Sequence, residues 1–492
     1  MHSFENFTDL FSMQEKRNPQ KTALHLDKTL ITYAELDFFI WKLTTFLYKN
    51  GIRPGNVVSL SFKSEFALLV TMLAVARIGA TVFVLPLSTP LLLSTQMVKK
   101  VNSKIRLTDI ENVDKTVIPF LHMDIKEIIQ DTSSINFHAR NNSPKDYWII
   151  VTGSGTTGKS KMMPITHEQQ LSRLILKGDW CSESSVDCFA SLMHLNHYTA
   201  IARSLATFYF GGSVVIDRSI HPINLVKHYK VTLLLATVFH VKKMMNKLPI
   251  NQKKVMPTLN GLLITGSSVS STLRKEIDDR ICSKLFVFYG INECGIVSVA
   301  KQPYIYEVSG TVGFPLTGSK IEILSDDLKV LPHGKTGQIR LKTEGMIDGY
   351  LNDEKETVHA FKDGWFYPGD MGKFTENGQL IHLGRADDMM IMAGNNVYPA
   401  EIEHCIISHP NVKEAVALPI KGDLAQEVPV CAVVLKDSVR STEKELLEYT
   451  YQYLASRSPK RIVILDTIKR NEQGKLLRTA LVEKIQTLLS TP

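Results

Sequence analysis

The chain has 492 residues, enough for two to four domains of about 150 residues each, which excludes a peptide ligand or a single small module. Hydrophobic residues make up 44% and charged residues 22%, with no low-complexity block, so a mainly disordered protein is excluded as well. The net charge of +8 is small for this length, and no run of like charges marks an arm that binds nucleic acid.

The start of the chain and its cysteines both indicate a reducing compartment. The N-terminal segment MHSFENFTDL lacks the basic-then-apolar order of a secretory signal, so we expect a cytoplasmic protein. The cysteines are scattered, form no CxxC pair and have no histidine at metal-ligand spacing. We therefore expect reduced, mostly buried thiols.

The first strongly predicted helix carries a complete start signal. Thr32 and Glu35 form a T-x-x-E capping box, in which each side chain satisfies a backbone N–H group of the first helical turn. Apolar residues then recur at helical spacing until Gly51 and Pro54 end the pattern. A strand is predicted next, over Val57–Phe62.

The stretch Phe66–Leu85 is nearly apolar and has the length of a bilayer span. Arg77 lies inside it, and Gly79 divides it into a helix-like half and a β-branched half. We therefore predict a buried helix followed by a buried strand, and no membrane span.

A glycine-rich string at residues 152–161, TGSGTTGKSK, follows a strand-like segment at Trp148–Val151. Glycines let several backbone N–H groups converge on one anion, and hydroxyls and lysines complete such a cradle, so we expect a phosphate-binding loop. Taken literally, Gly153–Ser160 also matches the P-loop pattern G-x-x-x-x-G-K-S. That pattern requires a helix directly after it, and Pro164 makes such a helix awkward.

Beyond this loop, strands and helices continue to alternate, which predicts parallel sheets covered by helices. The strands expected there are Val231–Leu235, Gly261–Thr265 and Lys284–Tyr289. After about residue 384 the pattern changes to a smaller α+β unit. Its expected elements are strands at Ala415–Leu418, Pro429–Leu435 and Arg461–Leu465, and a capped helix that begins at Thr442/Glu445.

Four further strings follow the glycine-rich loop in order. They are YGINE (289–293), GWFYPGD (364–370), GRADD (384–388) and NEQGKLLR (471–478). In order and spacing the set resembles the acyl-adenylate-forming superfamily of acyl-CoA synthetases, stand-alone and nonribosomal adenylation domains and luciferases, with the acyl-CoA synthetases as the most similar branch. The resemblance covers nearly the whole chain, so the P-loop match is best explained as a coincidence.

The resemblance implies an α/β fold: a large N-terminal domain of α/β subdomains with mostly parallel sheets and a smaller β subdomain, then a small mobile α+β C-terminal domain. It divides the chain into residues 1–384, a hinge at residues 385–388 that contains Asp387, and residues 389–492. It also implies the activity. Such enzymes use ATP and Mg²⁺ to activate a carboxylic acid to an acyl-adenylate with release of pyrophosphate, and then pass the acyl group to a thiol.

The same resemblance assigns roles to individual residues. Lys475 matches the catalytic lysine that bridges the carboxylate and the α-phosphate, and Glu293 matches a magnesium ligand, with Thr156 as a second metal ligand. Asp370 is expected to accept hydrogen bonds from both ribose hydroxyls, and Tyr289 to lie along the adenine ring. The full expected ATP-binding set is Thr152, Ser154, Gly155, Thr156, Thr157, Gly158, Lys161, Gly266, Ser267, Ser268, Tyr289, Gly290, Asn292, Asp370 and Arg385.

The sequence defines the carboxylic acid less closely than it defines the ATP-binding residues. The family places a histidine near the carboxylate; we assign this role to His197, with His194 as the competing candidate in SLMHLNHYTA. The segment after it contains no acidic residue to pair with an α-ammonium group, so an amino acid is disfavoured. The expected pocket segments, His197–Arg203, Val238–His240 and Tyr289–Val297, suit an aromatic or a short-to-medium aliphatic acid, whereas Asn196 offers an alternative contact for a polar substituent.

Coenzyme A is the expected acceptor, because GNNVYPAEIE (394–403) is more similar to the acyl-CoA synthetase form of this segment than to the amino-acid-activating form. The alternative acceptor is the phosphopantetheine of a separate carrier protein. We expect a monomer or a homodimer with no nucleic-acid partner. Two rival classes are a P-loop NTPase, based on Gly153–Ser160, and a nucleotide-binding protein without catalytic activity.

Overall fold

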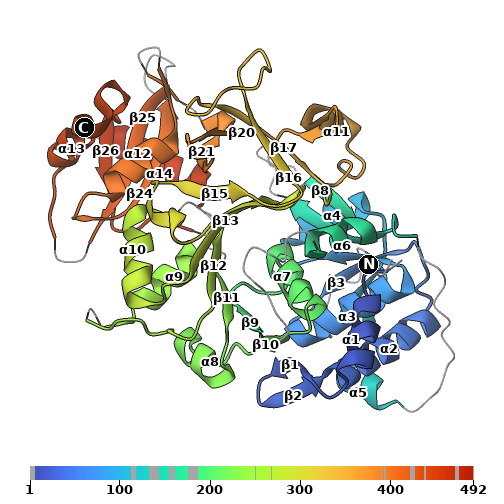
Figure 1. Cartoon of the computed structure of the whole chain (residues 1–492). Helices are drawn as coiled ribbons and strands as arrows, with labels where there is room; N and C mark the ends of the chain where they lie inside the picture. The colour runs from blue at the N-terminus through green and yellow to red at the C-terminus, as the bar shows by residue number, and fades with distance from the viewer. Residues whose placement is uncertain are drawn as a thin grey trace.

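The computed structural model describes residues 6–111, 118–131, 143–153, 161–175, 187–249, 251–266, 269–388, 390–392, 395–421, 427–436, 439–470 and 476–490. Helices and strands alternate through much of the chain and form two large sheets, and a smaller α+β unit follows at the C-terminal end (Figure 1). The predicted α/β fold, with a large N-terminal part and a small C-terminal part, is confirmed.

The first sheet has the strand order β6-β5-β3-β4-β7-β8. Its strands are β3 (Val57–Ser61), β4 (Thr81–Val84), β5 (Ser103–Thr108), β6 (Phe120–His122), β7 (Tyr147–Gly153) and β8 (Lys161–Thr166). Neighbouring strands are parallel except β7 and β8, which are antiparallel. A strand that contains Pro164 therefore follows the glycine-rich string, in place of the helix that a P-loop requires. The P-loop interpretation loses its structural basis.

The helices between residues 9 and 209 include the two that the sequence predicts, α2 and α3. They are α1 (Asp9–Arg17), α2 (Tyr33–Lys49), α3 (Glu65–Ile78), α4 (Leu91–Lys100), α5 (Ile125–Gln130), α6 (His167–Ile175) and α7 (Tyr198–Tyr209). The predicted capping box of α2 is present, because Thr32 Oγ1 accepts from the Glu35 N–H at 3.2 Å and Glu35 Oε2 accepts from the Thr32 N–H at 2.8 Å. The apolar stretch becomes helix α3, which ends at Gly79 (φ +84°), and strand β4. No helix within the described ranges is long and apolar enough to cross a membrane.

The second sheet has the strand order β18-β19-β17-β20-β21-β15-β14-β13-β12-β11-β9-β10-β1-β2, and β16 pairs with β17. Its parallel part consists of β1 (Thr22–Leu26), β10 (Ser213–Ile216), β9 (Cys188–Ser191), β11 (Leu233–Thr237), β12 (Gly261–Thr265) and β13 (Leu285–Ile291). Antiparallel β2 (Thr29–Thr32) borders one end of that part. The helices associated with it are α8 (Pro222–Tyr229), α9 (Val238–Met245) and α10 (Ser271–Arg280).

The rest of the second sheet is antiparallel and forms the expected β subdomain. Its elements are β14 (Gly295–Ala300), β15 (Thr311–Pro315), β16 (Ser319–Leu324), β17 (Gly337–Thr343), β18 (Phe361–Lys362), β19 (Trp365–Phe366), β20 (Asp370–Phe374), β21 (Leu380–Arg385) and helix α11 (Glu354–Ala360). Figure 1 shows β13 to β17 spanning the region between the N-terminal elements and the C-terminal unit.

The C-terminal unit contains a small sheet, β24-β25-β26, and helices pack against both of its faces. Its elements are β22 (Met390–Met392), β23 (Asn395–Val397), α12 (Pro399–Ile407), β24 (Val412–Lys421), β25 (Glu427–Leu435), α13 (Glu443–Leu454), β26 (Arg461–Ile464) and α14 (Arg478–Ser490). Alternate residues of β24 point to opposite faces, so Ala417 joins a core with Ile402 of α12, whereas Leu418 joins a second core with Leu481 of α14. The predicted hinge segment forms a short turn, η3 (Ala386–Asp388), between β21 and β22; its role as a domain boundary stays a prediction.

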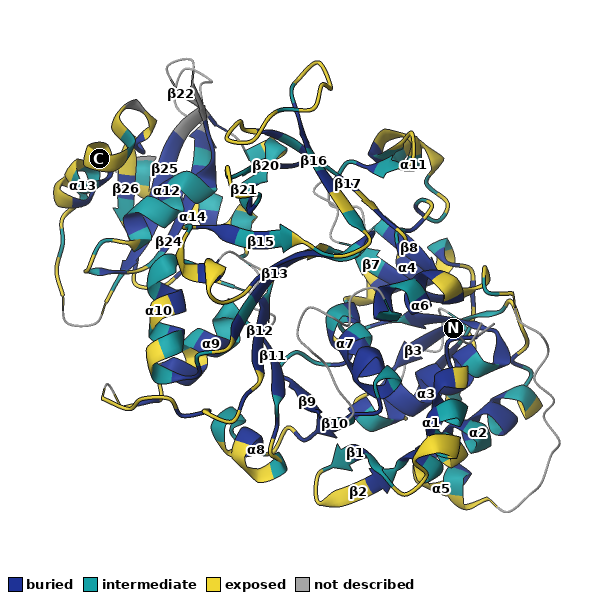
Figure 2. Ribbon diagram, viewed as in Figure 1, coloured by how far each residue is buried: buried dark blue, intermediate teal, exposed yellow. Residues whose placement is uncertain are grey.

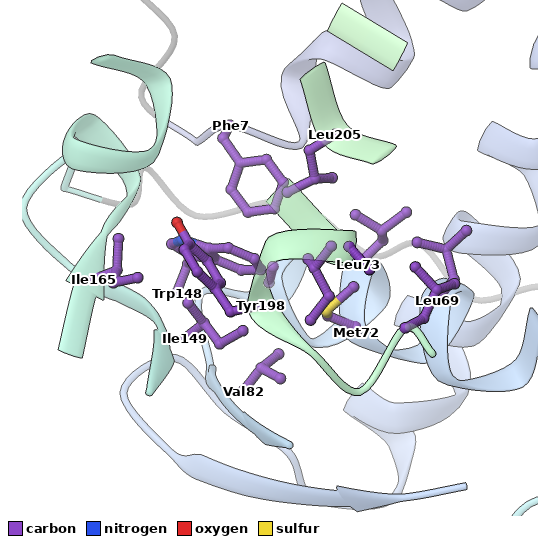
Figure 3. Close-up of a cluster of buried hydrophobic side chains, with 14 of the residues drawn as sticks. Phe7, Leu69, Met72, Leu73, Val82, Trp148, Ile149, Ile165, Tyr198 and Leu205 are labelled. Carbon is purple, nitrogen blue, oxygen red and sulfur yellow. The ribbon is translucent and has the colours of Figure 1, made fainter. Parts of the chain in front are cut away.

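The strands inside the sheets are more buried than the helices on the outside. Strands β9, β11 and β12 and helix α3 are mostly buried, whereas α8 and α11 carry exposed residues on their outer sides (Figure 2). Figure 3 shows part of the N-terminal core, where Phe7, Met72, Trp148 and Tyr198 lie among aliphatic side chains. The cysteines within the described ranges form no disulfide with one another and are mostly buried, as predicted.

Candidate active site

Three of the residues that the sequence singles out, Gly266, Asn292 and Glu293, directly follow parallel strands of the second sheet. Strands β11, β12 and β13 are parallel, so their carboxyl ends meet at one edge of the sheet. Gly266 follows β12 with a φ of +89°, a left-handed conformation that favours glycine. Asn292 and Glu293 follow β13 in the turn before β14. An edge of this kind is the usual place for a ligand in an open α/β sheet.

Asp370 is the centre of a buried polar cluster beside this edge. Asp370 is the first residue of β20, and in the antiparallel ladder it lies opposite Arg385, the last residue of β21. Tyr289 Oη donates to Asp370 Oδ2 at 2.6 Å, His382 Nε2 lies 3.3 Å from the same oxygen, and Arg385 Nη1 donates to Oδ1 at 3.2 Å. The rings of Tyr289 and His382 have centroids 4.9 Å apart. Both carboxylate oxygens therefore accept hydrogen bonds from this cluster.

The cluster keeps Asp370 ionised although it is only 5% exposed. Burial by itself raises the pKa of a carboxyl group, but the hydrogen bond and charge of His382, then Tyr289 and Arg385, lower the pKa of Asp370 below its ordinary value. Arg385 also donates to the Pro368 carbonyl, whereas its Nε is buried and has no hydrogen-bond partner in the part of the chain that the structure describes. That N–H group is available to donate a further hydrogen bond.

Glu293 forms a second buried carboxylate site in the β13–β14 turn. Its Oε1 accepts a hydrogen bond from Tyr350 Oη at 2.8 Å, and burial raises its pKa despite the opposing effects of this bond and of Lys161 and Arg173. Lys161 Nζ lies 4.9 Å from the centroid of the Tyr350 ring and 2.5 Å from Glu356 Oε1. The first residue of β8, next to the glycine-rich string, is thus joined to the Glu293 site.

Arg173 of α6 ties several segments of the site together. It is buried, and its guanidinium donates to the Gly345 carbonyl at 2.7 Å, to Tyr198 Oη at 2.9 Å and to the Glu293 carbonyl at 3.0 Å. Gly345 makes this approach possible, because a Cβ atom there would lie 2.5 Å from Arg173 Cγ. The three bonds fix the Glu293 turn relative to α6 and the start of α7.

The histidine segment is held by an ion pair between a buried carboxylate, Glu65, and an exposed arginine, Arg218. Glu65, at the start of α3, pairs with Arg218 at 2.6 Å and accepts from the Leu195 N–H at 2.7 Å. His194 Nδ1 lies 3.6 Å from Glu65, whereas His197 is the N-cap of α7. Burial lowers the pKa of both histidines, so both imidazoles are neutral near pH 7.

A pocket with a cavity volume of about 70 Å³ adjoins these residues. Its lining comes from α6, α7, the end of β12 and the β13–β14 hairpin: Gln170, Arg173, Leu174, Tyr198, Thr199, Ala202, Arg203, Ala206, Thr265, Phe288, Gly290, Ile291, Asn292, Gly295 and Ile296. Two of the three segments expected for the acid lie here, while the third, residues 238–240, is not part of this lining as the described residues define it. The lining is more polar than the sequence segments indicate, because Gln170 and Arg173 also contribute.

The structure brings the expected Tyr289, Asp370 and Arg385 together, and it joins Lys161 to Glu293 through Tyr350. Tyr289 contacts Asp370 through its hydroxyl, a contact that the expected stacking role did not include. Thr152 lies in β7, opposite Met162 of β8. Several expected residues lie outside the described ranges: Ser154, Gly155, Thr156, Thr157, Gly158, Ser267, Ser268 and Lys475.

Sequence reasoning missed Arg173, Glu356 and His382, and it assigned no role to Tyr350 within GYL. The contacts of these residues join segments far apart in the chain, so no local pattern marks them. The nearest signal is Arg173 itself, a charged residue on the otherwise buried side of an amphipathic helix.

Comparison with known proteins places the chain among enzymes of one family. The family model for AMP-binding enzymes matches residues 11–351, and the model for the AMP-binding enzyme C-terminal domain matches residues 401–475. The chain is similar to 4-coumarate–CoA ligase 2 of Nicotiana tabacum (25% identity, covering 93% of this chain and 90% of the relative). It is also similar to 2-succinylbenzoate–CoA ligase of Geobacillus sp. strain WCH70 (27% identity, 95% of each chain).

Solved structures share the fold over almost the full length. One is ATP-bound MatB from Rhodopseudomonas palustris, with a TM-score of 0.89, 23% identity, and coverage of 98% of this chain and 99% of that chain. Another is O-succinylbenzoate coenzyme A synthetase (MenE) from Bacillus subtilis in complex with ATP and magnesium ion, with a TM-score of 0.85, 22% identity, and coverage of 96% and 98%.

Proposed function

This chain belongs to the AMP-binding enzyme family, and on that premise we propose how its residues join a carboxylic acid to the thiol of coenzyme A. The enzyme is an AMP-forming acid–thiol ligase: it activates a carboxylic acid with ATP to an acyl-adenylate, releases pyrophosphate, and transfers the acyl group to a thiol. The observation that carries the assignment of the site is the Asp370 cluster, which lies beside the Glu293 turn at the edge where β11, β12 and β13 end.

The Asp370 cluster would hold the ribose of ATP. A buried carboxylate kept ionised by three neighbours offers acceptor oxygens to two adjacent hydroxyl donors. Arg385 adds a buried Nε–H donor for an oxygen on the ribose or phosphate side. Tyr289, fixed through its hydroxyl, presents its ring to the base, and Gly266, Gly290 and Asn292 border the same edge.

Glu293 fits a magnesium ion, because its buried carboxylate, held by the hydrogen bond from Tyr350 Oη, offers a hard oxygen ligand. Mg²⁺ bound there would neutralise negative charge on the phosphates and so favour attack by an anionic carboxylate. Thr156 is the second proposed ligand, and Lys161 is the proposed phosphate contact at the base of the glycine-rich loop.

Attack of the carboxylate on the α-phosphate needs a cation between two anions. Lys475 is proposed for that place, since a lysine ammonium is a compact charge with rotating donors. His197 is proposed to face the carboxylate, next to the pocket that α6, α7 and the β13–β14 hairpin form. Because His197 is neutral near pH 7, it would act as a hydrogen-bonding group and not as a charge.

The thiol must reach the carbonyl carbon that Lys475 occupies during the first step. We propose that the C-terminal unit turns about residues 385–388, with Asp387 absorbing the backbone change in the short turn η3. Coenzyme A is the proposed acceptor, supported by the names of the related CoA ligases. The phosphopantetheine of a separate carrier protein is the alternative with the same thiol chemistry.

The test is ATP–pyrophosphate exchange, measured over a panel of carboxylic acids with Mg²⁺ present. We expect exchange only when an acid is added, and Lys475→Ala should abolish it while ATP binding by calorimetry stays nearly unchanged. ATP hydrolysis that needs no acid would contradict the proposal and favour a nucleotide hydrolase. Nucleotide binding without exchange for any acid would favour a binding protein.

A further inference from the structure

A short hydrogen-bond relay connects α6 and α7 at the wall of the pocket. Arg173 Nη1 donates to Tyr198 Oη at 2.9 Å, and Tyr198 Oη donates to Gln170 Oε1 at 2.9 Å. All three side chains line the pocket, and all three are buried. The relay therefore ends on a side-chain amide inside the candidate acid site.

The chemistry of the relay fixes the orientation of that amide. A guanidinium N–H can only donate, so Tyr198 Oη accepts from Arg173 and its single proton is directed to Gln170. The oxygen of the amide must then face Tyr198, which leaves the Nε2 donors of Gln170 on the other side. Nε2 is buried and has no hydrogen-bond partner among the residues that the structure describes. An unpaired buried donor is unfavourable unless a ligand supplies an acceptor.

The surroundings of Gln170 favour an acceptor and hold the donor in place. Among the described residues of the lining, Arg173 and Arg203 are basic and none is acidic. The Tyr198 ring is packed in the N-terminal core (Figure 3), and Arg173 is anchored on the carbonyls of Gly345 and Glu293. A donor held by packed neighbours loses little freedom on binding, which is what a selective contact requires.

We propose that Gln170 is a specificity-determining residue, and that the enzyme selects carboxylic acids carrying a second hydrogen-bond acceptor, a carbonyl or carboxylate oxygen, which accepts from Gln170 Nε2. This inference rests on the proposed function and narrows its substrate class. The apolar surface of Phe288, Ile291 and Ile296 holds the carbon skeleton between the two polar ends of the acid.

The test compares acids in matched sets by ATP–pyrophosphate exchange. Each straight-chain monocarboxylic acid is set against the keto acid and the dicarboxylic acid of the same chain length, and the same is done with benzoic acids that carry or lack an acyl or carboxyl substituent. We expect kcat/KM to be about ten- to a hundredfold higher for the best acceptor-bearing acid than for its apolar match. The keto and dicarboxylic arms distinguish a carbonyl from a carboxylate as the preferred acceptor.

Variants of the relay separate this role from a structural one. Gln170→Leu should remove the preference, because kcat/KM for the acceptor-bearing acid falls to about that of its apolar match. Tyr198→Phe should lower the preference as well, because the amide loses the proton that fixes its orientation. Gln169→Leu is the matched control: Gln169 is the neighbouring residue on α6, bonds to Thr166 and Asp348, does not line the pocket, and should leave the preference intact.

The outcomes are distinct. Wild-type exchange that is equal for matched acids, or a preference that survives Gln170→Leu, overturns this inference and leaves the proposed function standing. Failure of the wild-type enzyme to exchange with any acid overturns the proposed function and this inference with it. A preference that is lost in Gln170→Leu and Tyr198→Phe but kept in Gln169→Leu supports it.

Discussion

Replacing Asp370 by asparagine tests the polar cluster of the site with almost no change in shape. In the wild type, Oδ1 accepts from Arg385, and Oδ2 accepts from Tyr289 with His382 nearby. An asparagine has one acceptor oxygen and one NH₂ group, so only one side of the group can still accept a hydrogen bond. On the Arg385 side the NH₂ group would face a guanidinium that can only donate, whereas on the other side it would face the Tyr289 hydroxyl, which can turn to accept. We expect the oxygen to stay on Arg385, so the variant loses the carboxylate charge from both bonds and the acceptor that Tyr289 and His382 share.

The expected loss of folding stability follows from the number of hydrogen bonds that the carboxylate accepts. A hydrogen bond to a charged group contributes about 1.5–3 kcal/mol and a neutral one about 1 kcal/mol. Because the bonds on both oxygens lose the charge of the carboxylate, we expect the folded state to lose about 2–4 kcal/mol of stability near pH 7. The wild-type contribution of Asp370 comes from a lowered pKa; it is present above the ordinary carboxyl pKa and is lost as the pH falls through the lowered value. The difference between wild type and variant should therefore shrink below about pH 4.

The assay combines urea unfolding at several pH values with calorimetric titration of ATP. We expect ATP binding to weaken about tenfold or more in Asp370→Asn. Glu443→Gln is the matched control, because Glu443 pairs with Arg461 at 2.6 Å on the surface of the C-terminal unit; it should cost less than about 1 kcal/mol and leave ATP binding unchanged. An Asp370→Asn protein as stable as the control and with wild-type ATP affinity would refute the reasoning.

Three further predictions use other parts of the molecule. Tyr350→Phe removes the hydrogen bond to Glu293, so ATP binding followed by calorimetry should need several-fold more Mg²⁺, and an unchanged Mg²⁺ dependence would count against Glu293 as a ligand. Burial raises the pKa of Glu403 to about 7, so the contribution of its protonated form to stability is present below the ordinary carboxyl pKa and is lost as the pH rises through about 7. Relative to Glu403→Gln, the wild type should lose up to about 3 kcal/mol of stability between pH 4.5 and pH 8. Parallel pH profiles of the two proteins in urea unfolding would refute this. Asp387→Pro should spare pyrophosphate exchange and slow thioester formation, and equal loss of both would contradict the hinge.

Much of the fold follows from local patterns that depend on nearby residues. The capping box at Thr32 and Glu35 fixes the start of α2, Gly79 divides an apolar run into α3 and β4, and Pro164 correctly disfavours a helix after the glycine-rich string. These features act over a few residues, so the sequence alone predicts them.

The candidate site was predictable only in part, for a physical reason. Tyr289, Asp370 and Arg385 stand in recognisable strings, but the bond between the Tyr289 hydroxyl and Asp370 joins residues 81 positions apart and depends on the order of strands in the sheet. Arg173 is a stronger case, because its contact with Glu293 spans 120 positions and requires the absent side chain of Gly345. No spacing in the sequence encodes such an approach.

An acid–thiol ligase that forms AMP transfers a carboxylate oxygen of the acid to the nucleotide, and isotope labelling of that oxygen measures the transfer. The enzyme is supplied with ATP, Mg²⁺, coenzyme A and an accepted acid labelled with ¹⁸O in its carboxylate, and the nucleotide product is analysed by mass spectrometry. We expect AMP that carries an ¹⁸O atom on its phosphate, because the acid oxygen that attacks the α-phosphate stays with AMP when the thiol takes the acyl group. ADP as the product, or AMP without the label, would contradict this expectation.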